Sequence, residues 1–198
     1  MSANILIDEL PTGVNVGGQF FKINANFRTC ILFESLIFDK AVPDKYKPQL
    51  ILNLFYEDKQ PADAAGAINA IIDFYSAGKK KRAPRPGKRQ AKKVQPRLYD
   101  FEYDADYIYA AFLSVYGIDL NEVDFLHWWK FKALFNALPE SAQIVKIIGY
   151  RATDTSQIKD QKERSRIARL KNMYALPSGM SEEEKVSAIG AMFGGNTK

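Results

Sequence analysis

The stretch from Asp119 to Glu140 constrains this chain most, because it contains both tryptophans, the only histidine and the densest group of aromatic residues. At 100° per residue its apolar side chains cover most of the circumference, and a helix that is apolar nearly all round belongs inside a fold. Asp119 and Glu122 have the spacing of a capping box, and Pro139 is expected to end the helix at Leu138. We therefore predict a central helix here, whose core residues are His127, Trp128, Trp129, Phe131 and Phe135.

No catalytic constellation is visible. The single cysteine, Cys30, and the single histidine, His127, allow neither a disulfide framework nor a zinc site. The glycine pairs match no nucleotide-binding motif, and the acidic run at 100–106 lacks the spacing and glycine of a calcium loop. We predict no enzyme, no cofactor and no metal site. His127 is interpreted as a hydrogen-bonded core histidine and Cys30 as a buried free thiol; Trp129, off the main apolar sector, could reach a surface.

The remaining pattern predicts a mainly α fold with a small N-terminal β hairpin. The hairpin strands are expected at Ile5–Leu10 and Gln19–Asn24. Helices are expected in the following ranges: 27–38 after Asn26, 47–56, 61–75 ended by Gly78, 107–116 ended by Gly117, 141–150, 160–176, and a last short helix after Ser181. The faces expected by helical spacing include Phe27, Ile31, Glu34 and Phe38 in the first range, Leu50, Ile51 and Leu54 in the second, and Tyr109, Phe112, Leu113 and Tyr116 as the core stripe of the fourth. The start of the chain is not typical of a signal peptide, and no segment has about 18 uninterrupted apolar residues. A soluble protein in the cytoplasm is expected.

Charge is concentrated in one segment. Its ten basic residues, with no acidic residue among them, are Lys79, Lys80, Lys81, Arg82, Arg85, Lys88, Arg89, Lys92, Lys93 and Arg97. Such a segment cannot offset its own ordering entropy, so a flexible basic insertion is predicted. Two readings remain open: contact with nucleic acid or an acidic protein surface, and a solvated linker. The predicted organisation is 1–78, the linker 79–97, a helical domain 98–177, and a short helix and tail at 178–198.

Four motifs in order carry a resemblance to a known family. They are Y-I-Y-A-A-F-L-S-V-Y-G-I-D-L at 107–120, L-H-W-W-K-F-K-A-L-F at 126–135, K-I-I-G-Y-R at 146–151 and M-Y-A-L-P at 173–177. Together they resemble a family of small proteins from tailed phages and prophages of Gram-positive bacteria, whose genes lie beside those for the major tail protein and the tape measure protein. The resemblance runs from about Asp100 to Pro177, and more loosely to the N-terminal pieces.

The resemblance implies a non-enzymatic assembly chaperone for the tape measure protein, acting in the host bacterial cytoplasm. Alternatives are a nucleic-acid-binding accessory protein acting through the basic segment, and a minor structural protein of the virion. The client is expected to contact narrow apolar stripes on the last two helices, formed by Ile167, Leu170, Met173, Val186, Ile189 and Phe193. Self-association along the client is also expected, and no membrane contact.

Overall fold

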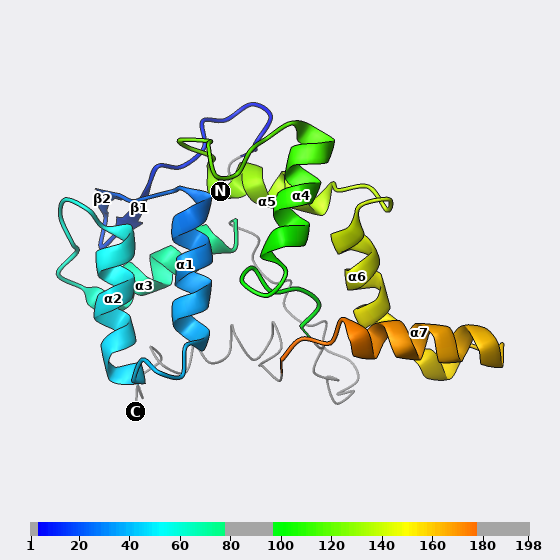
Figure 1. Ribbon diagram of the computed structural model, residues 1–198. Helices are drawn as coiled ribbons and strands as arrows, with labels where there is room; N and C mark the ends of the chain where they lie inside the picture. The colour runs from blue at the N-terminus through cyan, green and yellow to red at the C-terminus, as the bar shows by residue number, and fades with distance from the viewer. Residues whose placement is uncertain (1–3, 78–96, 178–198) are drawn as a thin grey trace, which may run out of the picture. The chain divides into compact units, whose positions relative to one another are not determined.

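Helices make up most of the described part of the chain, which is residues 4–77 and 97–177 of a computed structural model. Within those residues there are seven α-helices, two short 3-10 helices and one two-stranded antiparallel sheet (Figure 1). The prediction of a mainly α protein with an N-terminal hairpin is confirmed. The predicted basic insertion, except Arg97, and the predicted helix after Ser181 lie outside the described residues.

The described residues form two units. The first contains 4–77 and Phe125–Ala133, and the second contains 97–124 and 134–177. The sequence analysis placed the tryptophan-containing segment with the C-terminal helices. In the structure that segment packs with the N-terminal part, because its aromatic side chains lie against α1 and α3 of the first unit.

The hairpin pairs β1 (Gly13–Val16) with β2 (Gln19–Lys22), and Val14 lies opposite Phe21. Gly17 and Gly18 connect the strands with φ values of 57° and 81°, the positive φ that a tight two-residue turn needs at both positions. The second strand was predicted, but the expectation of a strand at Ile5–Leu10 is wrong. Ile5 to Asp8 form a turn instead, closed by hydrogen bonds to Asn4.

Three α-helices follow in the first unit. They are α1 (Phe27–Phe38), α2 (Lys47–Phe55), preceded by the 3-10 helix η1 (Asp44–Tyr46), and α3 (Ala64–Tyr75). Figure 1 shows α1 and α2 side by side, with α3 crossing behind them. The Asn26 side chain caps α1 by accepting from the Arg28 N–H at 3.1 Å, as predicted. The Lys47 ammonium closes the other end by donating to the Ile37 carbonyl at 3.0 Å.

The buried faces of these helices differ in part from prediction. On α1 the inward face is centred on Cys30 and Phe33, whereas the predicted face included the half-exposed Ile31. On α2 the expected Leu50 is exposed and Phe55 is buried in its place. Helices that are apolar on most sides leave the orientation of the inward face open, so neighbouring helices decide it.

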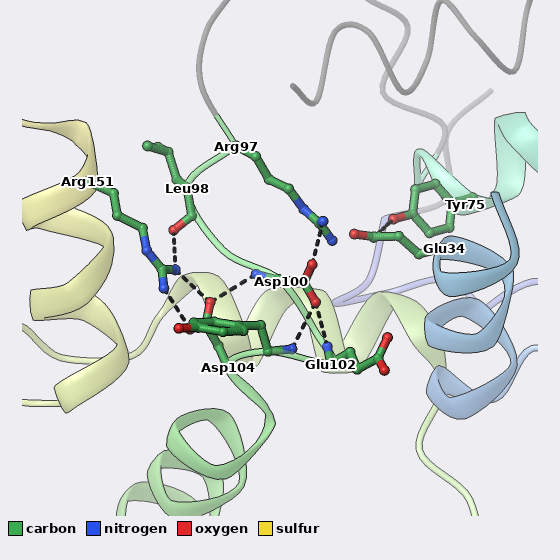
Figure 2. Close-up of polar contacts among 9 residues, drawn as sticks. Glu34, Tyr75, Arg97, Leu98, Asp100, Glu102, Asp104 and Arg151 are labelled. Carbon is green, nitrogen blue, oxygen red and sulfur yellow. Dashed lines mark hydrogen bonds and ion pairs between the residues drawn. The ribbon is translucent and has the colours of Figure 1, made fainter. Parts of the chain in front are cut away.

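A chain of aromatic contacts runs through the first unit. Phe27 stacks on Phe131 at 5.0 Å, Phe131 on Trp128 at 5.7 Å, and Trp128 on Tyr75 at 5.1 Å between ring centroids. Phe33 then contacts Tyr75 edge-on at 5.2 Å. The Tyr75 hydroxyl donates to the buried Glu34 carboxylate, as Figure 2 shows. Large aromatic residues therefore form a continuous part of this core.

The central helix is shorter than predicted. Helix α5 spans Trp128–Asn136, and the expected start at Asp119 is wrong. Asp119 instead accepts hydrogen bonds from the backbone N–H groups of Asn121 and Glu122 in a turn. Just before α5, His127 forms an isolated antiparallel bridge with Asn26. The Leu126 carbonyl and the Trp128 N–H are committed to this bridge, so no helix can pass through it.

The second unit contains α4 (Ala105–Tyr116), the end of α5, α6 (Gln143–Ala152), the 3-10 helix η2 (Thr155–Gln157) and α7 (Gln161–Met173). Gly117 ends α4 with φ 65°, as predicted. The buried side chains of α4 are Ile108, Ala111 and Phe112, while the expected Leu113 is exposed. Figure 1 shows α7 lying across the end of α6.

Candidate interaction surface

Three tyrosines lie together on the second unit, two of them in helices and one at the C-terminal end of a third helix. Tyr174, directly after α7, stacks on Tyr150 of α6 at 6.1 Å and contacts Tyr107 of α4 edge-on at 6.3 Å between ring centroids. All three side chains keep solvent-accessible surface, and Met173, beside Tyr174, is 62% exposed. Tyrosine and methionine are both enriched where proteins bind proteins, and tyrosine combines a large apolar ring with a polar hydroxyl. We call Tyr107, Tyr150 and Tyr174 the tyrosine cluster.

The stripe predicted to bind a client is only partly accessible. Ile167 is buried on the side of α7 that packs on α6, Leu170 is half-buried, and Met173 is exposed. Ile167 therefore contributes to the core of its own unit. Client contact through Ile167, Leu170 and Met173 stays a prediction. The other predicted contacts, Val186, Ile189 and Phe193, lie outside the described residues.

A buried ion pair is connected to the tyrosine cluster through the backbone of Tyr174. The Arg151 guanidinium donates two hydrogen bonds to the Asp104 carboxylate, at 2.6 and 2.9 Å, and Asp104 is 0% exposed (Figure 2). Arg151 also donates to the backbone carbonyls of Leu98 at 3.0 Å and Tyr174 at 2.6 Å. One guanidinium thereby joins the segment before α4, the start of α4, the end of α6 and the residue after α7.

The Asp104 carboxylate also accepts a hydrogen bond from the Asp100 N–H at 2.9 Å. A bidentate, fully hydrogen-bonded pair is the arrangement in which burial of two charges is compensated. Because Arg151 holds the Tyr174 carbonyl, the pair fixes where the tyrosine cluster is presented. The backbone at Tyr174 is therefore held in place, and with it the ring that contacts Tyr107 and Tyr150.

Arg97 is the one member of the predicted nucleic-acid segment that the structure describes. Its guanidinium forms an ion pair with Asp100, whose other carboxylate oxygen accepts from the N–H groups of Glu102 and Tyr103 (Figure 2). Arg97 thus belongs to the start of the second unit. Nucleic-acid contact through Lys79 to Lys93 stays a prediction.

His127 joins three parts of the first unit. Its Nδ1 accepts the Trp129 N–H at 3.1 Å, so this nitrogen carries no proton. Its Nε2 therefore carries the proton and donates to the Pro11 carbonyl at 3.0 Å. Burial lowers the pKa of His127 from its ordinary value, the Pro11 hydrogen bond opposes this, and Lys130 adds to it. His127 is neutral, caps α5 and anchors the segment before β1.

The two indole N–H groups close the end of α3. Trp128 Nε1 donates to the Tyr75 carbonyl at 2.8 Å and Trp129 Nε1 to the Phe74 carbonyl at 2.8 Å. Both side chains are buried, as are the other expected core residues His127, Phe131 and Phe135. Carbonyls in the last turn of a helix lack partners within the helix. The tryptophans supply two side-chain donors there, beside the Ala77 N–H, which also donates to the Phe74 carbonyl at 2.9 Å.

Other ionisable groups are explained by their local structure. Cys30 is a buried free thiol, and burial raises its pKa well above the usual range. Burial also raises the pKa of Tyr56 to about 12. The bidentate hydrogen bond from Arg166 lowers the pKa of Glu163 on the surface of α7. Across residues 4–77 and 97–177 no three His, Cys, Asp or Glu side chains gather as metal ligands would.

Sequence reasoning missed the tyrosine cluster and the ion pair. It placed Tyr109, not Tyr107, among the core residues of α4, although Tyr109 donates to Asp119 at 3.0 Å. Arg151 had a usable signal, since it follows Ile144 and Ile147 at helical spacing on the same inward face. An arginine there needs a buried acid, and the acid directly before α4 was a candidate.

Comparison with protein families gives a match over most of the chain. A family model described as Bacteriophage Gp15 protein matches residues 6–176. No curated protein matches the chain, and neither does any solved structure. No helix of the described residues is long and apolar enough to span a membrane. Because the family model covers most of the sequence, the chain belongs to the bacteriophage Gp15 protein family.

Proposed function

We propose that this phage protein is a tail-assembly chaperone that binds the tape measure protein in the host cytoplasm. The observation that carries the proposal is membership of the bacteriophage Gp15 protein family across residues 6–176. The resemblance of the motifs at 107–120, 126–135, 146–151 and 173–177 to proteins encoded beside tape measure genes supplies the tail-specific part.

The physical argument concerns the client. A long helical tape measure exposes apolar stripes until tube subunits surround it, and such stripes aggregate unless they are covered. A chaperone needs a surface that is apolar enough to bind and weak enough to be displaced when tube subunits compete for the same stripe. Partly exposed tyrosines fit this demand, because each ring offers apolar area and a polar edge.

We assign client binding to the tyrosine cluster. It lies at the junction of α4, α6 and the end of α7, and the Asp104–Arg151 pair holds its central residue by the backbone. This assignment places client contact at the exposed or partly exposed tyrosines of the second unit, instead of at the buried Ile167 of the same unit. Its breadth over three helices suits a helix laid across it.

Co-expression with the tape measure protein tests the proposal, using Tyr107→Gln as the surface variant. Leu113→Gln is the matched control, because Leu113 is on the same helix, is 43% exposed against 36% for Tyr107, and lies about 120° away around the axis. Wild type and Leu113→Gln should keep the client soluble and co-purify with it, and Tyr107→Gln should lose both.

Two results contradict the proposal. If wild-type protein neither solubilises nor binds the client, the chaperone function is wrong. If the protein is abundant in purified virions, it is a structural component. Client binding by Tyr107→Gln equal to wild type would leave the function intact and refute the assignment to the tyrosine cluster.

A further inference from the structure

The most exposed large apolar side chains of the described residues lie near the N-terminus of the first unit. Leu6 is 86% exposed and Ile7 is 80% exposed, with Ile5 beside them at 41%. Asp8 and Glu9 follow directly and are exposed as well. We call residues 5–9 the N-terminal knob: three aliphatic side chains followed by two carboxylates.

The knob is held in a defined shape. The Asn4 carbonyl accepts from the N–H groups of Ile7 and Asp8, and its side chain accepts from the Leu6 N–H at 3.0 Å. The Asp8 carboxylate in turn accepts a hydrogen bond from the Asn4 N–H at 2.7 Å. A few residues on, the Pro11 carbonyl is held by His127. Presenting apolar groups on an ordered turn lowers the entropy lost on binding.

A complementary surface occurs on α7 of the second unit. At 100° per residue, Lys162, Arg166, Arg169 and Met173 fall within about 60° of each other, on the side away from Ile167. All four are exposed. We call them the α7 stripe. The helix as a whole carries five basic residues and one acidic residue, and Ile167 is its buried side chain.

We propose that the N-terminal knob of one copy docks on the α7 stripe of a second copy. Leu6 and Ile7 pack on Met173 and on the aliphatic stems of the basic side chains, which arginine and lysine offer while their charges stay in water. Asp8 and Glu9 lie next to the cations of the stripe. The acidic pair makes an anionic lipid surface or nucleic acid an unfavourable partner for the knob, since phosphates would repel Asp8 and Glu9.

Each copy carries one knob and one stripe. Two copies can exchange both contacts in a two-fold dimer, whereas copies that each make one contact per neighbour extend into chains or close into a ring. The contact needs no client, which separates this inference from the proposed function. It also provides a physical route for many copies to cover one long client.

Sedimentation velocity of the purified full chain over a range of concentrations tests the inference. The weight-average mass of wild type should rise with concentration and fall when salt screens the charges. Leu6→Asp should reduce association at least about tenfold, or about 1.4 kcal/mol. Phe20→Asp is the control for that variant, because Phe20 is 61% exposed in the same unit but lies outside the knob.

A charge swap gives the sharper test. Glu9→Lys alone and Lys162→Glu with Arg169→Glu alone should each sediment as monomers. An equimolar mixture should associate, because the stripe variant keeps the wild-type knob and Glu9→Lys keeps the wild-type stripe. Arg164→Glu is the matched control: Arg164 lies on the same helix, about 160° away from Lys162 and about 140° away from Arg169, and its reversal should leave association unchanged.

A concentration-independent monomer for wild type at low salt overturns the inference, as does a mixture that stays monomeric while wild type associates. Association that persists in Leu6→Asp would also refute it. All substituted side chains are exposed, so the substitutions are expected to leave the fold intact. Circular dichroism of every variant checks this.

Discussion

Asn26 and His127 face each other across an antiparallel bridge, and each of them caps the helix that follows it. The Asn26 side chain accepts the Arg28 N–H at the start of α1, and His127 Nδ1 accepts the Trp129 N–H at the start of α5. The bridge itself pairs the Phe27 N–H with the Leu126 carbonyl and the Trp128 N–H with the Ala25 carbonyl, both at 2.9 Å. Two helix starts thus satisfy each other's unpaired donors.

This arrangement makes the stability of the first unit depend on pH through His127. The pKa of His127 is lowered by folding, so below about pH 6.5 the unfolded chain binds a proton that the folded chain does not. The free energy of unfolding should therefore fall as pH decreases from about 6.5 toward the lowered pKa, and should lose nothing further from this residue below that pKa.

Chemical denaturation between about pH 7.5 and 5.5 measures this dependence. His127→Asn is the matched variant, because an asparagine oxygen can cap α5 but cannot titrate; its stability should stay flat across the interval. The single histidine also gives one imidazole signal by NMR. A His127 pKa at or above 6.5 in the folded protein would contradict the prediction.

The tryptophan caps lead to a second prediction. Trp129→Phe keeps an aromatic ring beside Phe74 but removes the donor to the Phe74 carbonyl, and should destabilise the protein by about 1–3 kcal/mol. Trp128→Phe should cost a similar amount through the Tyr75 carbonyl. Equilibrium unfolding in denaturant provides the comparison. If both variants are as stable as wild type, the indole N–H groups do not contribute to stability at the end of α3 and the prediction is wrong.

Local signals predicted most of the helices. Asn26 caps α1 and Gly117 ends α4 where the sequence predicted, because caps are set by hydrogen bonds within a few residues. The start of α5 was missed for the opposite reason. Asp119 makes the same short-range hydrogen bonds in a turn as it would at a helix start, and only the bridge between His127 and the distant Asn26 decides between them.

The surfaces show a similar limit. The spacing of Ile167 and Leu170 correctly predicted an apolar side of α7, but spacing cannot tell whether that side meets another helix of the same chain or a partner. Packing on α6 covers it. The tyrosine cluster combines residues from three helices, so no single periodic pattern contains it. Arg151 likewise meets Asp104 only through the fold.

Glycine substitutions at the end of α3 and inside it should change the stability of the protein in opposite directions. Ala77 has φ 55°, a left-handed conformation that glycine adopts without strain, and the expected terminating glycine, Gly78, lies just beyond the described residues. Ala77→Gly should stabilise the protein by about 0.5–1 kcal/mol, whereas Ala70→Gly within α3 should destabilise it by about 1 kcal/mol. Thermal unfolding of both variants tests the pair. A loss of stability in Ala77→Gly would contradict the left-handed conformation.

The last prediction concerns the Asp104–Arg151 pair. Asp104→Ala leaves a buried guanidinium without its carboxylate and should destabilise the second unit by about 3–5 kcal/mol. Asp106→Ala is the matched control, because Asp106 is exposed two residues further along and should change stability by less than about 1 kcal/mol.

Replacing both charges distinguishes a buried-charge penalty from lost packing. Asp104→Leu combined with Arg151→Met should recover much of the loss seen in Asp104→Ala, since no unpaired charge stays buried. The double variant would still lack the donor to the Tyr174 carbonyl at 2.6 Å, so the tyrosine cluster should loosen even where stability returns. Hydrogen exchange at Tyr174 and client binding measure that loosening. A double variant with restored stability and unchanged exchange would show that Arg151 does not position the cluster.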